Sequence, residues 1–141
     1  DLRLSLGYPD RQAERALLAG EDRRDMLTRL QPVMDLPALR RAQAQVQSVH
    51  AADAVLDYLQ DLVAATRSGR WFAQGLSPRA ALAVLRAAKA QAWLEGRGYV
   101  APDDIAAILP QTIAHRLVTA GDGAHAPQDQ VRAMVDAVPL R

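Results

Sequence analysis

The sequence predicts an all-α fold, a single bundle of about six to eight helices preceded by a short extended segment. Alanine and leucine dominate the 141 residues and aromatic residues make up only 4%, a composition that favours helices. Apolar residues recur three or four positions apart over most of the chain, as they do on the buried face of a helix. The length suffices for one hydrophobic core, so we expect one domain.

The first nine residues are predicted to be extended. Leu2, Leu4 and Leu6 alternate with polar residues, the period of a strand or of an extended linker. A candidate hinge follows at Tyr8 and Pro9, because the glycine before them tolerates unusual φ values and the proline restricts Tyr8 to extended conformations. Residues 1–9 are therefore predicted to form a linker that leads into a helical domain.

Hydrophobic periodicity predicts three helices in the next forty residues. They cover residues 10–18, residues 21–30 and a stretch from about 39 to 49. The positions expected to face inward are Ala13, Ala16, Leu17, Met26, Leu27, Leu30, Leu39, Ala42, Val46 and Val49. These spacings would give each helix one apolar face.

The strongest period predicts a helix over about residues 51–67. Its apolar stripe consists of Val55, Leu56, Leu59, Leu62, Val63 and Thr66. Residues 68–75 are expected to be a loop that carries Trp71 and Phe72. These two side chains would either be exposed and dock a partner or fold back onto the bundle, and the sequence leaves both alternatives open.

The longest helix is predicted over residues 77–95. Ser77 is the candidate N-cap, because its hydroxyl can accept a hydrogen bond from an unpaired backbone N–H. Pro78 then occupies the first helical position, which its fixed φ suits, and Arg79 occupies the second. The positions expected to face inward are Leu82, Leu85, Ala88 and Ala92.

Two or three short helices are predicted after residue 101. Pro102 begins one of them, with Asp103 and Asp104 at its positive end. Pro110 either kinks this helix or begins a new one, which would contain Ile113, Leu117 and Val118. We expect the helical domain to span residues 10–120 and residues 121–141 to form a loop and a last short helix over about 128–137.

Composition excludes several classes of function. Seventeen basic and sixteen acidic side chains give a net charge of +1, so no overall field favours nucleic acid or an anionic membrane. Without cysteine there is no thiol catalysis or zinc–thiolate site, and no apolar run is long enough to span a membrane. His50, His115 and His125 are too scattered to predict a metal site. The sequence alone shows no catalytic centre.

Arg79 is the one residue whose placement indicates a ligand. A cation in the first turn opposes the helix dipole, yet a guanidinium and free N–H groups can converge there on one phosphate. The alternative is an ordinary solvated arginine, which the hexapeptide alone does not exclude.

Several motifs, in their order, resemble the C-terminal helical lid of MoxR-type AAA+ ATPases over roughly residues 5–118. They are Gly7-Tyr8-Pro9, Val49-His50-Ala51-Ala52-Asp53, Ala65-Thr66-Arg67, Gly75-Leu76-Ser77-Pro78-Arg79-Ala80, Glu95-Gly96-Arg97-Gly98-Tyr99-Val100 and His115-Arg116-Leu117. The sequence departs from the family at Ala52 and Ala101, where the family more often has a serine or threonine cap.

The resemblance implies that the chain belongs to a larger cytoplasmic ATPase. Residues 1–9 would then be the linker and hinge from an ATPase core that carries the Walker motifs and binds ATP with Mg²⁺. Arg79 would be the sensor-2 arginine that acts in catalysis by reaching the γ-phosphate, and Tyr8 and Pro9 would lie near the nucleotide base. This fragment would not bind ATP alone.

The resemblance also implies partners. Such ATPases form rings, often hexamers, so neighbouring subunits would contact the lid, and they work as chaperone-like assembly factors beside proteins with von Willebrand factor A domains. Neither nucleic acid nor membrane is expected as a partner. An alternative function is a freestanding helical protein-interaction module that uses Trp71, Phe72 and the helix over residues 77–95.

Overall fold

The structure, a computed structural model, describes residues 2–20, 22–119 and 124–140 and confirms the predicted helical fold. The α-helices of these residues are α1 (Arg11–Ala19), α2 (Arg23–Leu27), α3 (Leu36–Ser48), α4 (Asp53–Arg67), α5 (Pro78–Leu94), α6 (Pro102–Ile113) and α7 (Gln128–Ala137). A 3₁₀ turn, η1 (Ala114–Arg116), follows α6, and two short strands are β1 (Phe72–Gln74) and β2 (Val118–Thr119).

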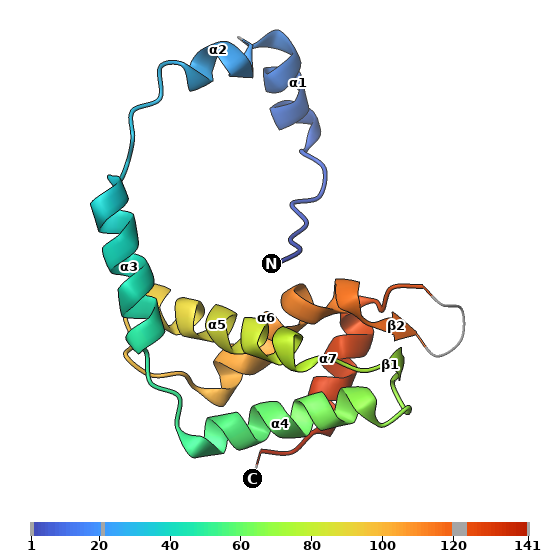
Figure 1. Ribbon diagram of the computed structural model, residues 1–141. Coiled ribbons are helices and arrows are strands. Elements are labelled where there is room, and N and C mark those ends of the chain that lie inside the picture. The colour runs from blue at the N-terminus through green and yellow to red at the C-terminus, as the bar shows by residue number, and fades with distance from the viewer. Residues whose placement is uncertain (1, 21, 120–123, 141) are drawn as a thin grey trace.

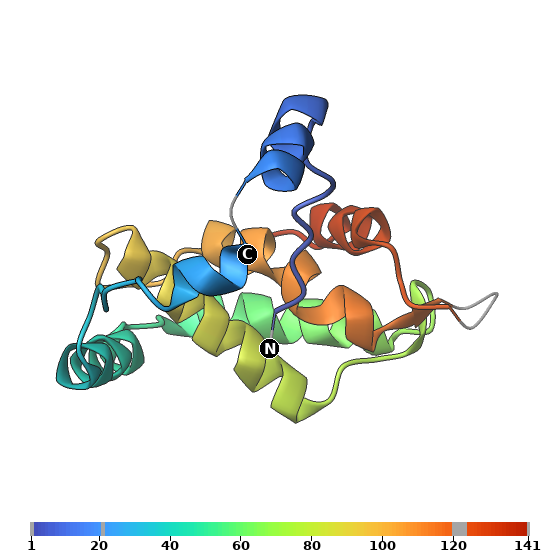
Figure 2. The ribbon, with the colours of Figure 1, turned by 90° about the horizontal axis from the view of Figure 1, so that it is seen from above.

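Helices α4 to α7 enclose the hydrophobic core (Figures 1 and 2). The stripe predicted on α4 is buried except for the half-buried Leu56, and Tyr58 joins it. The matching side chains across the core are Ile105, Leu109, Ile113, Val131 and Met134, each with 0% exposure. The apolar period of the sequence therefore predicted the buried face of α4 correctly.

Helix α5 packs on α6 through small side chains, which the sequence analysis predicted only in part. Its buried residues are Ala80, Val84, Ala88 and Ala92, spaced by four so that they form one ridge. Leu82 was expected inside but is 56% exposed. The prediction rests on leucine being more often buried than alanine. In the structure the small side chains of the ridge let α6 approach closely, and Leu82 faces outward.

The N-terminal helices do not join the core. Helices α1 and α2 contain no buried residue, and Figure 1 shows them in an arc that stands away from α4 to α7. The prediction that they bury an apolar face within this domain is wrong for the described residues, since Leu18 and Leu27 are 85% and 65% exposed. Helix α2 is also shorter than predicted, and the expected start at Glu21 lies outside the described residues.

The segment expected to be a loop over residues 68–75 contains β1, which pairs antiparallel with β2. This pairing was not predicted, because its partners are more than forty residues apart in the chain. Phe72 is 1% exposed in the core and Trp71 packs partly buried against it. The alternative in which Phe72 is an exposed docking side chain is therefore wrong, and the fold-back alternative is confirmed.

The C-terminal part follows the prediction more closely. Helix α6 continues through Pro110 to Ile113, so the alternative of a new helix beginning at Pro110 is wrong, and Val118 lies in β2 rather than in a helix. Helix α7 lies where it was predicted. Residues 121–123 of the expected loop lie outside the described residues.

The turn between α5 and α6 is held by a charged cluster. Both terminal nitrogens of Arg97 donate to Asp104, at 2.7 and 2.6 Å, and Oδ2 of Asp104 also accepts from the backbone N–H of Ala101 at 2.7 Å. Ala101 is the N-cap residue of α6, and its side chain cannot cap the helix. The Asp104 carboxylate, in the first turn of α6, instead accepts a hydrogen bond from the Ala101 backbone N–H. The hydrogen bonds from Arg97 lower the pKa of the Asp104 carboxyl.

Asp104→Asn should lower the free energy of unfolding by about 2 kcal/mol at pH 7, because it weakens charge-assisted hydrogen bonds of a buried carboxylate. A carboxyl whose pKa is lowered by folding stabilises the fold above its unfolded pKa of about 3.9 and loses that effect as the pH falls further. Urea unfolding at several pH values should therefore show wild type and variant converging below about pH 4. Asp129→Asn, in an exposed pair with Arg132, is the matched control, and a pH-independent difference would contradict the assignment.

Candidate functional site

The first turn of α5 is capped as predicted. The Ser77 hydroxyl accepts a hydrogen bond from the Ala80 N–H at 3.2 Å, and Pro78 occupies the first helical position. Arg79 follows with its side chain exposed. A guanidinium is thus presented to solvent from a capped helix start, whose Ala80 and Ala81 N–H groups already donate to Ser77.

The residue before the cap is fixed to the end of α4 by two side chains. The N–H of Leu76 donates to Oγ1 of Thr66 at 3.1 Å, and its carbonyl accepts from Nε of Arg67 at 2.9 Å. Thr66 is fully buried and its hydroxyl donates to the Val63 carbonyl at 2.6 Å. Both backbone groups of Leu76 are satisfied, so the start of α5 has a defined position on α4.

Gly75 completes this junction because no side chain fits there. A Cβ at position 75 would overlap with Cγ of Arg67 and lie 2.8 Å from its Cα. The backbone of the chain before α5 therefore runs directly over the backbone of α4. We call Thr66, Arg67, Gly75 and Leu76 the α4–α5 junction.

Arg79 lies at a hollow between the first half of α5 and η1. The hollow is lined by Arg79, Leu82, Ala83, Arg86, His115 and Arg116, and we call it the basic hollow. No carboxylate is among these described lining residues. The short side chain of Ala83 lies on the helix face between the two arginines of α5 and leaves room between them.

His115 lines the basic hollow, and its surroundings lower its pKa. Burial lowers the pKa of its imidazole, and the positive charges of Arg116, Arg3 and His125 lower it further. Its Nε2 accepts from Nε of Arg116 at 3.3 Å, and its Nδ1 is buried without a hydrogen-bond partner among the described residues. Burial is the largest of these causes, so the lowered pKa favours the neutral form of His115.

The other two predicted site residues lie elsewhere. Tyr8 and Pro9 are exposed in the extended segment before α1, and no contact described in this structure joins them to Arg79. Gly7, just before them, has a φ of +67°, a left-handed conformation that favours glycine. The N–H of Arg3 donates to the carbonyl of Gln111 at 2.9 Å, which holds the beginning of this segment near the end of α6.

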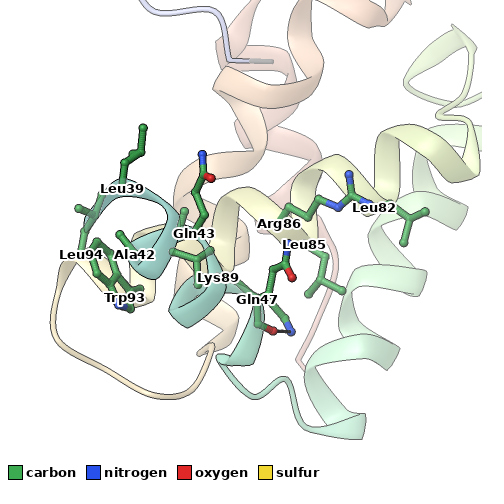
Figure 3. Close-up of a pocket in the computed structure, with 12 residues that line it drawn as sticks. Leu39, Ala42, Gln43, Gln47, Leu82, Leu85, Arg86, Lys89, Trp93 and Leu94 are labelled. Carbon is green, nitrogen blue, oxygen red and sulfur yellow. Dashed lines mark hydrogen bonds between the residues drawn. The ribbon is translucent and has the colours of Figure 1, made fainter. Parts of the chain in front are cut away.

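A second, mostly apolar groove lies between α3 and α5 (Figure 3). Trp93 and Gln45 join its walls by a hydrogen bond of 3.2 Å, and Lys89 reaches the Gln47 carbonyl at 3.2 Å. Leu82 and Arg86 line this groove and the basic hollow alike. The outer face of α5 is therefore exposed near Arg79 and partly covered by α3 beyond Arg86.

Neither a metal site nor a membrane-spanning segment is predicted from the sequence. Within the described ranges, no group of three or more histidine or acidic side chains is arranged to hold a metal ion. No helix in the part of the chain that the structure describes has the length and apolarity needed to cross a membrane.

Comparison with known proteins gives the family. The AAA lid domain family matches residues 64–138, which include α5, the α4–α5 junction and the basic hollow. The chain belongs to the AAA lid domain family.

The relatives include a protein named as a MoxR chaperone. The chain is 34% identical over 116 residues to the uncharacterized protein YeaC of Bacillus subtilis, a match that covers 82% of this chain and 36% of that protein. It is 30% identical over 131 residues to Chaperone MoxR1 of Mycobacterium tuberculosis, with 85% and 34% covered. These matches confirm the resemblance to the lid of MoxR-type AAA+ ATPases. The chain spans only about a third of the length of these two relatives.

A solved structure supports the fold. A candidate ATPase of Cytophaga hutchinsonii superposes with a TM-score of 0.81 at 20% identity and covers 99% of this chain and 46% of that one. The arc of α1 and α2 is included in this coverage. The whole arrangement of the chain therefore recurs in a known structure.

The basic hollow could not be predicted from the sequence, because it exists only where η1 lies beside the first half of α5.

Gly75→Ala should lower the free energy of unfolding by about 1–3 kcal/mol, because the added methyl group would collide with Arg67 and force the backbone apart. Gly98→Ala is the control, since a Cβ there would meet nothing within 4 Å. Chemical denaturation of both variants measures the difference. Equal stability of the two variants would contradict the close approach at the α4–α5 junction.

Proposed function

We propose that this chain is the nucleotide-sensing lid of a MoxR-type AAA+ ATPase and that Arg79 is its sensor-2 arginine. In this proposal Arg79 contacts the γ-phosphate of ATP that a separate core of the same protein binds with Mg²⁺. The observation that supports it is the exposed side chain of Arg79, on a helix start fixed by the α4–α5 junction and beside a hollow with no carboxylate among its described lining residues.

A rigidly placed arginine lets ATP bridge two domains. With Arg79 on one phosphate and the core on the others, the lid has a preferred angle that is lost when the γ-phosphate leaves. A charge-assisted hydrogen bond of this kind contributes about 1.5–3 kcal/mol. Hydrolysis would thus be converted into movement of the lid, as a chaperone-like assembly factor requires.

The extended segment over residues 2–9 and the arc of α1 and α2 are suited to connect the lid to the ATPase core. Residues 2–9 are extended with Gly7 in the left-handed region, which suits a hinge, and Leu6 is 99% exposed. Apolar side chains exposed over a continuous stretch indicate a surface that a partner covers. We propose that the core covers this arc, with Tyr8 and Pro9 near the nucleotide base, and that neighbouring lids and cores close a ring.

The alternative of a freestanding interaction module is weakened. Phe72 is buried in the core and so is withdrawn from any partner. The open face of α5 remains available, but the family match assigns residues 64–138 to a lid. We therefore retain the lid as the proposed function.

Arg79→Ala in the full-length ATPase should lower ATP turnover by about tenfold to a hundredfold, which corresponds to the loss of one charge-assisted phosphate contact. The fold should be unaffected, because Arg79 is exposed and alanine favours helices. Steady-state hydrolysis measures the effect, and Arg41→Ala, an exposed arginine on α3, is the matched control. Turnover equal to that of wild type would refute the sensor role.

A further inference from the structure

We propose that the groove between α3 and α5 binds an amphipathic helix of another protein, one that carries acidic residues beside its apolar face. The groove follows the part of α5 that begins at Leu82, whereas Arg79 lies in the first turn of the helix. The inference therefore goes beyond the sensor role, because this docking involves no nucleotide.

Helix α3 leaves its apolar face incompletely covered. It contains no buried residue, and Leu39, Ala42 and Val46, which the sequence places on one face, line the groove. On the side of α5, Leu82 and Leu94 also line it and are 56% and 73% exposed. Apolar side chains exposed together along a groove indicate a surface that a partner covers.

The shape of the groove favours a helix as its occupant. Its walls are two helices, joined by side-chain hydrogen bonds from α5 to α3, and the backbone groups along a helix are paired within it. The groove therefore offers no strand edge with which an extended peptide could pair. From Leu82 to Leu94 it follows about 18 Å of helix axis, or about three turns, and Figure 3 shows these two side chains at opposite ends.

The charges around the groove favour an acidic occupant. Helices α3 and α5 together contain five basic residues and no acidic residue, although the whole chain has 17 basic and 16 acidic residues. Arg86 and Lys89 line the groove, and no carboxylate is among its described lining residues. The acidic residues that flank the two helices are engaged elsewhere, since Asp35 caps α3 and Glu95 pairs with Arg97. Opposite charges across an interface speed association and select the partner.

The described helices of a second copy of this chain do not supply such an occupant. Helices α4, α6 and α7 contain acidic residues but bury their apolar faces in their own core. The exposed helices α1 and α2 each contain two basic residues and one acidic residue. In the proposed function the ATPase core reaches the other end of α5, at Arg79. We therefore assign the acidic helix to a different protein.

The test titrates the 141-residue chain with a synthetic peptide of about 16 residues, long enough to form a helix. The peptide has leucine at helical positions i, i+3, i+4 and i+7 and glutamate beside them, and a matched peptide has lysine in place of glutamate. The chain has two tryptophans. Trp93 lines the groove and Trp71 packs against the core, so the NMR signal of one indole N–H is the probe and that of the other is the internal control.

The glutamate peptide should shift the indole signal of Trp93 and leave that of Trp71 unchanged. The lysine peptide should bind at least about tenfold more weakly, because its charges are repelled by Arg86 and Lys89. Added salt should reduce the difference between the two peptides, since it screens exposed charges.

Two variants separate charge from apolar contact. Arg86→Glu should weaken binding of the glutamate peptide by about threefold to tenfold, because an exposed attraction becomes a repulsion. The fold should be kept, since Arg86 is exposed and glutamate favours helices about as well as arginine. Leu39→Ala should weaken binding of both peptides, because it removes an apolar contact without a change of charge. Arg132→Glu, on the exposed surface of α7, is the matched control and should bind as wild type does.

Several results would overturn the inference. Equal binding of the two peptides, or shifts of both indole signals, would show apolar association without selectivity. No shift of the Trp93 signal, or an Arg86→Glu variant that binds like wild type, would remove the groove as the docking site. In the full-length ATPase, a Leu39→Ala variant that no longer assembles would assign the groove to a neighbouring subunit. The sensor role stands or falls separately, on ATP turnover in Arg79→Ala.

Discussion

The position of Arg79 depends on the hydrogen bonds by which α4 holds Leu76. Thr66 and Arg67 satisfy the N–H and the carbonyl of this residue, and Gly75 lets the backbone pass close enough for them to do so. A helix start is otherwise one of the more mobile parts of a helix, because its first N–H groups have no intrahelical partner. Fixing the residue before the cap gives the backbone that carries Arg79 a defined position.

The rest of the domain supports this junction. The alanine ridge of α5 packs against α6, and the cluster of Arg97 and Asp104 fixes the turn between these two helices. Helix α6 then leads into η1, which brings His115 and Arg116 to the basic hollow. The core therefore orients α5 from both ends, while the arc of α1 and α2 takes no part in it.

Sequence reasoning succeeded where the determining interactions are local. The cap at Ser77 and the position of Arg79 follow from neighbouring residues, and the stripe of α4 follows from its period. It failed where contacts between segments distant in the chain determine the structure. The inward face of α5 depends on how closely α6 approaches. The burial of Phe72 depends on the pairing of β1 with β2. For the same reason the sequence offered Arg79 as a candidate but not the hollow beside it, which exists only once η1 is in place.

The most direct test is a structure of the full-length ATPase with a non-hydrolysable ATP analogue bound. The account predicts that a terminal nitrogen of Arg79 lies about 2.7–2.9 Å from an oxygen of the γ-phosphate, the length of a charge-assisted hydrogen bond, with the α4–α5 junction unchanged. An Arg79 that points away from a fully bound γ-phosphate, with the lid closed, would contradict the central claim.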